Sequence, residues 1–288
     1  MSASSTVRRL RQRARDGTPL IVPGIVNALT ARIFEEAGFE AVIAGGYAAA
    51  AATFALPDVG LLTETEMTEH VRRIAGAVTL PVIADADTGY GEVANVVRTV
   101  RHFEAAGAAG IIIEDQVSPK RCGHMQGKEL INTAAMVAKI RAAVDARVEP
   151  ETIIVARTDA LGVTGLDDAI ARLHAYTEAG ADWLFPDAPS SIEDMKRIAA
   201  ATRLPLVADM VEGSSTPLLE PSQLLELGWP IVLFPSTALR AAAQVVELVA
   251  RSLRHRGTSI DVLDMLMQVD HLHELLRLQT WDSYERGG

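Results

Sequence analysis

Short apolar runs alternate with stretches of helical periodicity along the whole chain, and this alternation limits the fold more than any other feature. Runs rich in Val, Ile and Leu predict strands at 20–24, 40–45, 81–86, 109–114, 152–157, 182–186, 204–209 and 230–234. Helices are predicted at about 28–38, 62–76, 92–106, 132–146, 166–179, 191–202, 220–227 and 236–254. Strands that are apolar on both faces are typical of a parallel sheet covered by helices. Eight strand–helix units predict an α/β protein with a (β/α)8 barrel of the TIM type; an open doubly wound sheet is the alternative.

Three junctions between a helix and the next strand share one pattern, in which a glycine ends the helix: Gly38, Gly107 and Gly180. Glycine accepts the left-handed backbone that often terminates a helix. No low-complexity linker interrupts the 288 residues, so we expect a single domain over 1–288. The leucine-rich segment 259–284 predicts a C-terminal helical arm, which either packs on its own barrel or docks on a second subunit.

Composition excludes several classes of protein. The net charge is −10 and the sequence has no basic stripe, which argues against nucleic-acid binding. No apolar run approaches the roughly 18 residues of a membrane span. The basic segment 1–17 lacks the apolar core of a secretory signal and predicts a short surface helix. Cys122 is the only cysteine, so we expect the reducing environment of the cytoplasm, with a small molecule as the partner.

Glycines or charged residues follow at least six of the strands, at the end where barrel enzymes carry their catalytic groups. They are Gly45 and Gly46, Asp85 and Asp87, Glu114 and Asp115, Arg157 and Asp159, Asp187, and Asp209. A single carboxylate in such a place is more often a helix cap or a solvated loop residue. Carboxylates after five strands, however, converge on one mouth and repel one another, unless some are protonated or a cation neutralises them.

Asp85 and Asp87 are the metal-ligand pair that the sequence favours, because both follow one buried strand. Hard carboxylate oxygens completed by water suit Mg²⁺, with Mn²⁺ as a second candidate. The turn at 88–91 contains two glycines and can bend close to an ion. We therefore predict a divalent-cation site at this rim of the barrel.

The loop 115–128 and the end of the fifth strand carry two further candidates. Cys122 lies beside Lys120, Arg121 and His124 in the sequence, and nearby cations favour the thiolate. The alternative is a buried cysteine that packs as a small apolar side chain. Arg157 ends an apolar strand and is either a clamp on a substrate carboxylate or a partner in a structural ion pair with an aspartate.

Six segments, taken in order, resemble the isocitrate lyase / phosphoenolpyruvate mutase superfamily. They are LPDVG (56–60), ADADTGYG (84–91), IEDQ (113–116), PKRCGH (119–124), ARTDA (156–160) and the region 207–217. The resemblance extends from about residue 10 to 280, and KRCGH is its most specific part. It implies a (β/α)8 barrel, Mg²⁺ and a homotetramer whose last helices swap between neighbouring subunits.

The resemblance also implies a role for each matching residue. The metal is held by Asp85 and Asp87, directly or through water, with support from Glu114. The α-keto-acid half of a substrate is bound by Gly45, Gly46 and Arg157, and Asp58 lies near the metal. The implied catalytic set is Cys122, Arg157, Glu114 and His124, and the implied substrate-binding set is completed by Gly123, Asp187 and Asp209.

The cysteine of KRCGH marks the carbon–carbon lyases of the superfamily. The resemblance therefore implies Mg²⁺-dependent cleavage of a small 2-hydroxy dicarboxylate, either a substituted malate or a methylisocitrate-like compound, to an α-keto acid and a carboxylate. In that reaction Cys122 protonates the carbanion as a general acid.

The sequence departs from the methylisocitrate lyase pattern at Val42, Ala44, Asp187, Asp209 and Asp270. These departures favour a substituted malate over a tricarboxylate. Three alternatives remain: a phosphonomutase of the carboxyphosphonoenolpyruvate or phosphoenolpyruvate type, an oxaloacetate decarboxylase or hydrolase on the same scaffold, and a degenerate barrel that only binds ligands.

Overall fold

The eight predicted strands are all present in the computed structural model, which describes residues 3–123 and 125–286. Each observed strand overlaps its predicted run, and the ends differ by a few residues. They are β1 (Leu20–Pro23), β2 (Val42–Ala44), β3 (Val82–Asp85), β4 (Ala108–Glu114), β5 (Ile153–Thr158), β6 (Trp183–Pro186), β7 (Val207–Asp209) and β8 (Ile231–Phe234).

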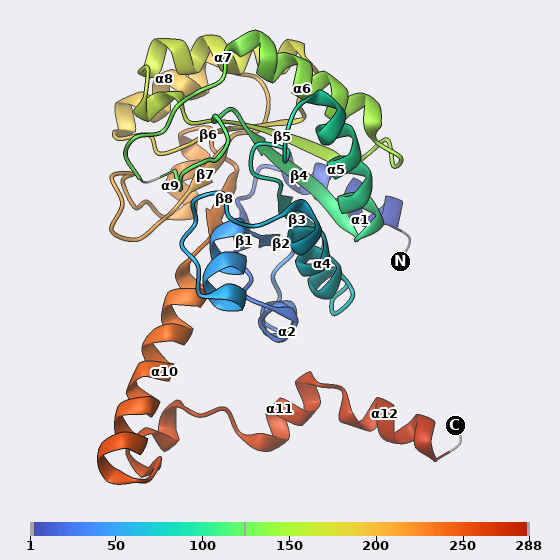
Figure 1. Cartoon of the computed structure of the whole chain (residues 1–288), viewed down its shortest axis with the longest axis vertical. Coiled ribbons are helices and arrows are strands. Elements are labelled where there is room, and N and C mark those ends of the chain that lie inside the picture. The colour runs from blue at the N-terminus through green and yellow to red at the C-terminus, as the bar shows by residue number, and fades with distance from the viewer. Residues whose placement is uncertain (1–2, 124, 287–288) are drawn as a thin grey trace.

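The strands form a closed parallel barrel. One run of hydrogen-bonded strands has the order β1-β8-β7 and the other β2-β3-β4-β5-β6. A parallel bridge between Gly24 and Ile43 joins β1 to β2, and a bridge between Leu184 and Leu206 joins β6 to β7. These two bridges close the sheet on itself, with helices arranged around it (Figure 1). The predicted (β/α)8 barrel is therefore confirmed, and the open sheet is excluded.

A helix follows every strand, as the periodicity predicts. The eight helices that match predictions are α2 (Ala28–Glu36), α4 (Glu64–Ala75), α5 (Val93–Ala105), α6 (Thr133–Ala146), α7 (Leu166–Glu178), α8 (Ile192–Ala201), α9 (Pro221–Glu226) and α10 (Thr237–Arg256). Gly38, Gly107 and Gly180 have φ values of 85°, 100° and 101°, so each takes the left-handed backbone predicted for it. In the described chain, no helix is both long enough and apolar enough to cross a membrane.

Two apolar cores hold the barrel together. Side chains that point outward from the strands pack under the helices, while inward-pointing side chains such as Ile112, Val155 and Leu233 fill the barrel. The N-terminal helix α1 (Ala3–Arg13) places Val7 and Leu10 in the inner core, with exposures of 3% and 1%. The expected short helix is present: Arg8 and Arg9 are exposed on its surface, and its apolar face is buried in the barrel core.

A helical segment after β2 was not predicted. It consists of α3 (Gly46–Ala49) and a π-helix at Ala50–Phe54, and Ala55 ends it in a left-handed conformation. Its sequence, a run of alanines, is a good helix former, but the repeating strand–helix pattern already assigned one helix to this unit. The segment matters because the N-terminus of α3 lies at the carboxyl end of the barrel.

The C-terminal arm extends away from the barrel (Figure 1). In the described chain, α10 buries only Ser252, and it leads to a 3₁₀-helix (Ile260–Met265), α11 (Val269–Leu275) and α12 (Leu278–Glu285). The arm touches its own barrel where α11 meets α2, through the hydrogen bond from Arg32 Nη1 to the Leu275 carbonyl (2.7 Å). Apolar side chains along the arm remain exposed, including Leu263 (54%) and Trp281 (64%).

Candidate active site

A cavity of about 300 Å³ opens at the carboxyl end of the barrel strands. It brings together most of the residues that the sequence singles out. Those that line it are Gly45, Gly46, Asp58, Asp85, Cys122, Gly123, Arg157, Asp187 and Asp209. Asp87 and Glu114 are buried directly beside it, and His124 lies outside the described residues.

One wall of the cavity, the metal side, carries the predicted metal ligands Asp85 and Asp87. Asp85, at the end of β3, is its centre. One carboxylate oxygen, Oδ2, accepts the backbone N–H of Gly46 at the start of α3 (3.0 Å). The other, Oδ1, accepts the N–H of Asp87 (3.0 Å), which has a left-handed φ of 46°. A Cβ added to Gly46 would lie 3.2 Å from Asp85 Oδ2 and 3.3 Å from Asp87 Oδ1. The two carboxylates therefore converge on the backbone at Gly46.

Lys120 supplies a positive charge to these carboxylates. Its Nζ lies 2.5 Å from Asp58 Oδ1 and 3.0 Å from Asp87 Oδ1. Burial raises the pKa of Asp87 to about 7, although Lys120 opposes the shift. The sequence suggested that Lys120 favours a thiolate at Cys122. The structure instead directs its ammonium to Asp58 and Asp87, on the metal side of the cavity.

The metal side fits a hard divalent cation that keeps part of its water shell. Its donors are carboxylate oxygens, and Glu114 Oε1 is buried nearby without a hydrogen-bond partner. Burial raises the pKa of Glu114 well above its usual value, so a cation brought close would restore its charge. Among the described residues, no three acidic, histidine or cysteine side chains are grouped closely enough to enclose a metal. Two carboxylates with waters are a common Mg²⁺ arrangement.

Arg157, from β5, is surrounded by three carboxylates. Its Nε lies 3.3 Å from Glu114 Oε2 and 3.0 Å from Asp159 Oδ2, and its Nη2 lies 3.1 Å from Asp187 Oδ2. The guanidinium also stacks over the ring of Phe185, 5.1 Å from its centre. The structural ion pair expected as one alternative is therefore present. The side chain still lines the cavity, so it can also face a bound anion.

The carboxylates around Arg157 differ in their protonation. Burial would raise the pKa of Asp159, but Arg157 and Lys128 outweigh it and lower that pKa below its usual value. Burial dominates at Asp187 and raises its pKa to about 6. Asp159 is thus a fixed anion, whereas Asp187 and Glu114 retain protons more readily. The side-chain cations Arg157 and Lys128 neutralise part of the crowded negative charge, and the raised pKa values of Asp187 and Glu114 reduce it further as pH falls.

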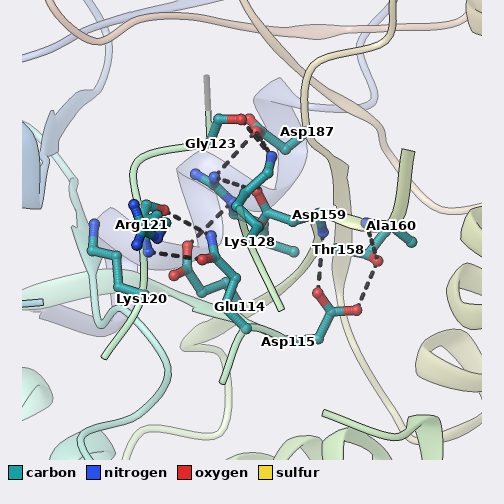
Figure 2. Close-up of polar contacts among 12 residues, drawn as sticks. Glu114, Asp115, Lys120, Arg121, Gly123, Lys128, Thr158, Asp159, Ala160 and Asp187 are labelled. Carbon is teal, nitrogen blue, oxygen red and sulfur yellow. Dashed lines mark hydrogen bonds and ion pairs between the residues drawn. The ribbon is translucent and has the colours of Figure 1, made fainter. Parts of the chain in front are cut away.

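Asp115 supports this cluster from below without reaching the cavity. It is fully buried and accepts hydrogen bonds from the Thr158 hydroxyl (2.7 Å), the Asp159 N–H (3.0 Å) and the Tyr176 hydroxyl (2.6 Å). Arg172 Nη1 lies 3.1 Å away and balances its charge. Figure 2 shows Asp115 holding the 158–159 backbone on the side away from Gly123.

The loop after β4 carries Cys122 to the wall of the cavity. The Cys122 N–H donates to the Asp58 carbonyl (3.1 Å), and the Gln116 side chain binds both the N–H and the carbonyl of Arg121. Gly123 then passes so close to the Arg157 cluster that a Cβ there would lie 2.0 Å from Asp187 Oδ2. Cys122 is half-buried and lines the cavity, so it is not the fully buried apolar residue of the alternative interpretation.

Several site residues were not identified from the sequence. Lys128 joins the Arg157 cluster from the far end of the cysteine loop, and Arg172 and Tyr176 reach Asp115 from α7. Ser236 and Arg240, around the start of α10, also line the cavity. The sequence indicated these residues only by their position. Lys128 lies in the loop after β4, and Ser236 and Arg240 lie at the start of the helix after β8. Arg172 and Tyr176 lie one helical turn apart on α7.

The fold and the site define a class, a (β/α)8 barrel with a small-molecule site rich in carboxylates. Within that class, a model of the phosphoenolpyruvate phosphomutase family matches residues 10–254, and the chain belongs to that family. A probable 2-methylisocitrate lyase from Corynebacterium glutamicum is 44% identical over 99% of this chain and 93% of its own length. The 2,3-dimethylmalate lyase of Eubacterium barkeri is 42% identical over 96% of this chain and 95% of its own. The resemblance drawn from the sequence motifs is confirmed.

A solved structure extends the comparison to a different reaction. The crystal structure of a phosphonopyruvate hydrolase, in complex with oxalate and Mg²⁺, has a TM-score of 0.88 to this chain and 30% sequence identity. The match covers 100% of this chain and 99% of that one. One scaffold thus serves proteins named for carbon–carbon and for phosphonate chemistry.

The raised pKa of Asp187 predicts a pH-dependent stability. The folded chain keeps a proton on Asp187 up to about pH 6, while the unfolded chain releases it near pH 4. The free energy of unfolding should therefore fall as pH rises from 4 to 6, and Asp187→Asn should remove up to roughly 3 kcal/mol of that fall. Urea unfolding at several pH values measures the difference. Asp167→Asn, at a highly exposed site, is the control and should keep the wild-type profile; an Asp187→Asn profile parallel to wild type would contradict the assignment.

Proposed function

We propose that this protein is a carbon–carbon bond lyase that cleaves a small 2-hydroxy dicarboxylate to an α-keto acid and a carboxylate. The observation that carries the proposal is the placement of Cys122 and of the Asp85 side of the barrel on one cavity. A lyase of this kind needs an acid at the departing carbon and a charged anchor for the keto-acid half. The names of the two lyase relatives support the same reaction type.

The cavity limits the size and charge of the substrate. Its volume of about 300 Å³ is at the lower end of the range for small-molecule sites. Apolar Val211, Leu233 and Pro235 also line the cavity, as does Arg240, whose Nη1 lies 3.2 Å from Glu212 Oε2. One further carboxylate and small alkyl substituents suit these walls. A substituted malate therefore fits better than a tricarboxylate, which would place a third carboxylate near Asp187 or Asp209.

We propose that Mg²⁺, or Mn²⁺, binds on the metal side, where Asp85 and Asp87 would hold it directly or through water and Glu114 would support it. The oxygen-only donor set and the unpartnered Glu114 Oε1 favour such an ion. The Mg²⁺ in the phosphonopyruvate hydrolase structure adds support from the family. When bound, the ion would lower the energy of negative charge that develops on the substrate hydroxyl and carboxylate.

Arg157 anchors the keto-acid carboxylate. Its neighbours Glu114 and Asp187 leave room for a further negative charge, because burial raises their pKa values and so favours their neutral forms. The backbone at Gly45 and Gly46 borders the same end of the cavity.

Bond cleavage then requires two proton movements. The substrate hydroxyl gives its proton to a carboxylate on the metal side, and its oxygen becomes the keto oxygen as the neighbouring carbon–carbon bond breaks. The electron pair of that bond remains on the departing carbon, next to its carboxylate. The Cys122 thiol protonates this carbon and is reprotonated afterwards.

The role of Cys122 predicts a selective loss of activity. Cys122→Ser should lower turnover by about 10²–10⁴-fold, because a hydroxyl is a far weaker acid than a thiol. Binding of oxalate or pyruvate in the presence of Mg²⁺, measured by calorimetry, should be retained. Turnover is followed as α-keto-acid release from a panel of alkylmalates, methylisocitrate and oxaloacetate. Met125→Ala, an exposed position in the same loop, is the control.

Two outcomes would contradict this assignment. Undiminished turnover by Cys122→Ser would remove the acid role. Reaction with phosphonopyruvate in preference to every hydroxy acid, followed by phosphorus NMR, would instead favour the phosphonate chemistry that the phosphonopyruvate hydrolase structure represents.

We further propose that the barrel with its arm forms one domain and assembles as a cytoplasmic homotetramer in which the arm swaps between subunits. The proposal rests on α10, of whose residues only Ser252 is buried, and on the exposed apolar side chains of the arm. Exposed apolar patches of this kind are typical of interfaces between subunits.

Assembly can be tested by light scattering. The wild-type chain should have four times the monomer mass of 30.8 kDa. Leu263→Asp and Trp281→Asp should shift the mass toward smaller species, because a buried charge opposes docking. Val148→Asp, at a still more exposed apolar position on the barrel (74%), should remain tetrameric. A monomeric wild-type chain would contradict the proposal.

A further inference from the structure

Lys128 lies at the far end of the cysteine loop and is almost completely buried; its side chain is 4% exposed. An ammonium in such a place is costly unless several acceptors surround it. Its Nζ donates to the Gly123 carbonyl and lies 2.9 Å from Asp159 Oδ1 and 3.8 Å from Asp187 Oδ2. Figure 2 shows Lys128 between Gly123, Asp159 and Asp187.

The loop itself has separate attachments along its length. At its base, the Val117 N–H donates to the Glu129 carbonyl (2.8 Å) and the Ile131 N–H to the Asp115 carbonyl (2.9 Å). The Cys122 N–H reaches the Asp58 carbonyl on the metal side. Towards β5 and β6, Lys128 donates a hydrogen bond to the carbonyl of Gly123, the residue that follows Cys122.

We propose that Lys128 is a positioning residue that fixes Cys122 over the cavity by tying the Gly123 carbonyl to Asp159. Asp159 is itself held by Asp115 and Arg157, so the loop is fastened to a residue with several buried polar contacts. Removal of the ammonium leaves Gly123 without this attachment, while its backbone remains crowded against Asp187. The loop then moves outward and takes the thiol away from the substrate.

The inference deepens the proposed lyase function, but its main test does not depend on turnover. Cys122 is the only cysteine, so the rate of its modification by a thiol reagent such as iodoacetamide reports on this one loop. Lys128→Met should accelerate modification by about tenfold or more, because loss of a charge-assisted hydrogen bond frees the loop. Loss of a nearby cation acts in the opposite direction, since it disfavours the thiolate. A faster reaction therefore indicates displacement of the loop.

Lys139→Met is the matched control. Lys139 is another buried lysine, and its Nζ donates to the Thr88 carbonyl (2.9 Å) on the metal side. It should leave the modification rate of Cys122 at the wild-type value. If Lys128→Met does not fold, Lys128→Leu, which also lacks a donor, takes its place. A wild-type rate in the Lys128 variant, or an equal acceleration in both variants, would overturn the proposal.

Kinetics provide a second readout if one of the hydroxy acids is a substrate. Lys128→Met should lower kcat at least about tenfold and change KM little, because the acid is displaced while Arg157 and the metal side stay in place. The rate is divided by the concentration of folded enzyme, because partial unfolding alone would also lower the apparent kcat at an unchanged KM. If no compound is turned over, the lyase proposal fails but the thiol-modification result still decides the role of Lys128.

Discussion

The site depends on a buried network of ion pairs in which Arg157 is the centre. Glu114, Asp159 and Asp187 surround its guanidinium, and Lys128 provides the second cation. Removing one partner of such a buried set costs about 3–5 kcal/mol, because the others remain charged without compensation. The three carboxylates and Arg157 meet because the carboxyl ends of the neighbouring parallel strands β4, β5 and β6 lie side by side in the barrel.

Both halves of the proposed chemistry are attached to this network. On one side, the Glu114 N–H donates to the Asp87 carbonyl (2.9 Å), which links the cluster to the turn that carries the metal-side carboxylates. On the other side, Lys128 links Asp159 to the backbone beside Cys122. The anchor for the keto acid and the acid for the departing fragment are therefore held relative to one another by the same buried charges.

Periodicity predicted most of the fold because each strand is apolar on both faces and each helix has a regular apolar stripe. The α3 segment and the path of the arm were not predictable in the same way. The α3 segment is a second helical segment within one strand–helix unit. The arm leaves the barrel although its leucines are spaced like those of a packed helix. The strand-end positions of Asp85, Arg157 and Asp187 predicted a common rim because parallel strands end together.

The partners of the charged residues were harder to predict than their location. Lys120 was expected beside the thiol, but its ammonium lies at Asp58 and Asp87. Lys128 and Arg172 reach the site through long side chains from a loop and a helix, and sequence spacing does not determine where such flexible groups end. Roles for Cys122, His124 and the metal-side carboxylates remain predictions from motif and position.

The central claim, that one cavity holds both the metal side and the cysteine, is tested most directly by crystals soaked with Mn²⁺ and oxalate. Anomalous scattering should place one Mn²⁺ beside Asp85 and Asp87, with oxalate between the ion and the walls formed by Arg157 and Cys122. An ion bound elsewhere in the barrel mouth, or oxalate bound away from Arg157 with no ion at Asp85, would contradict the account.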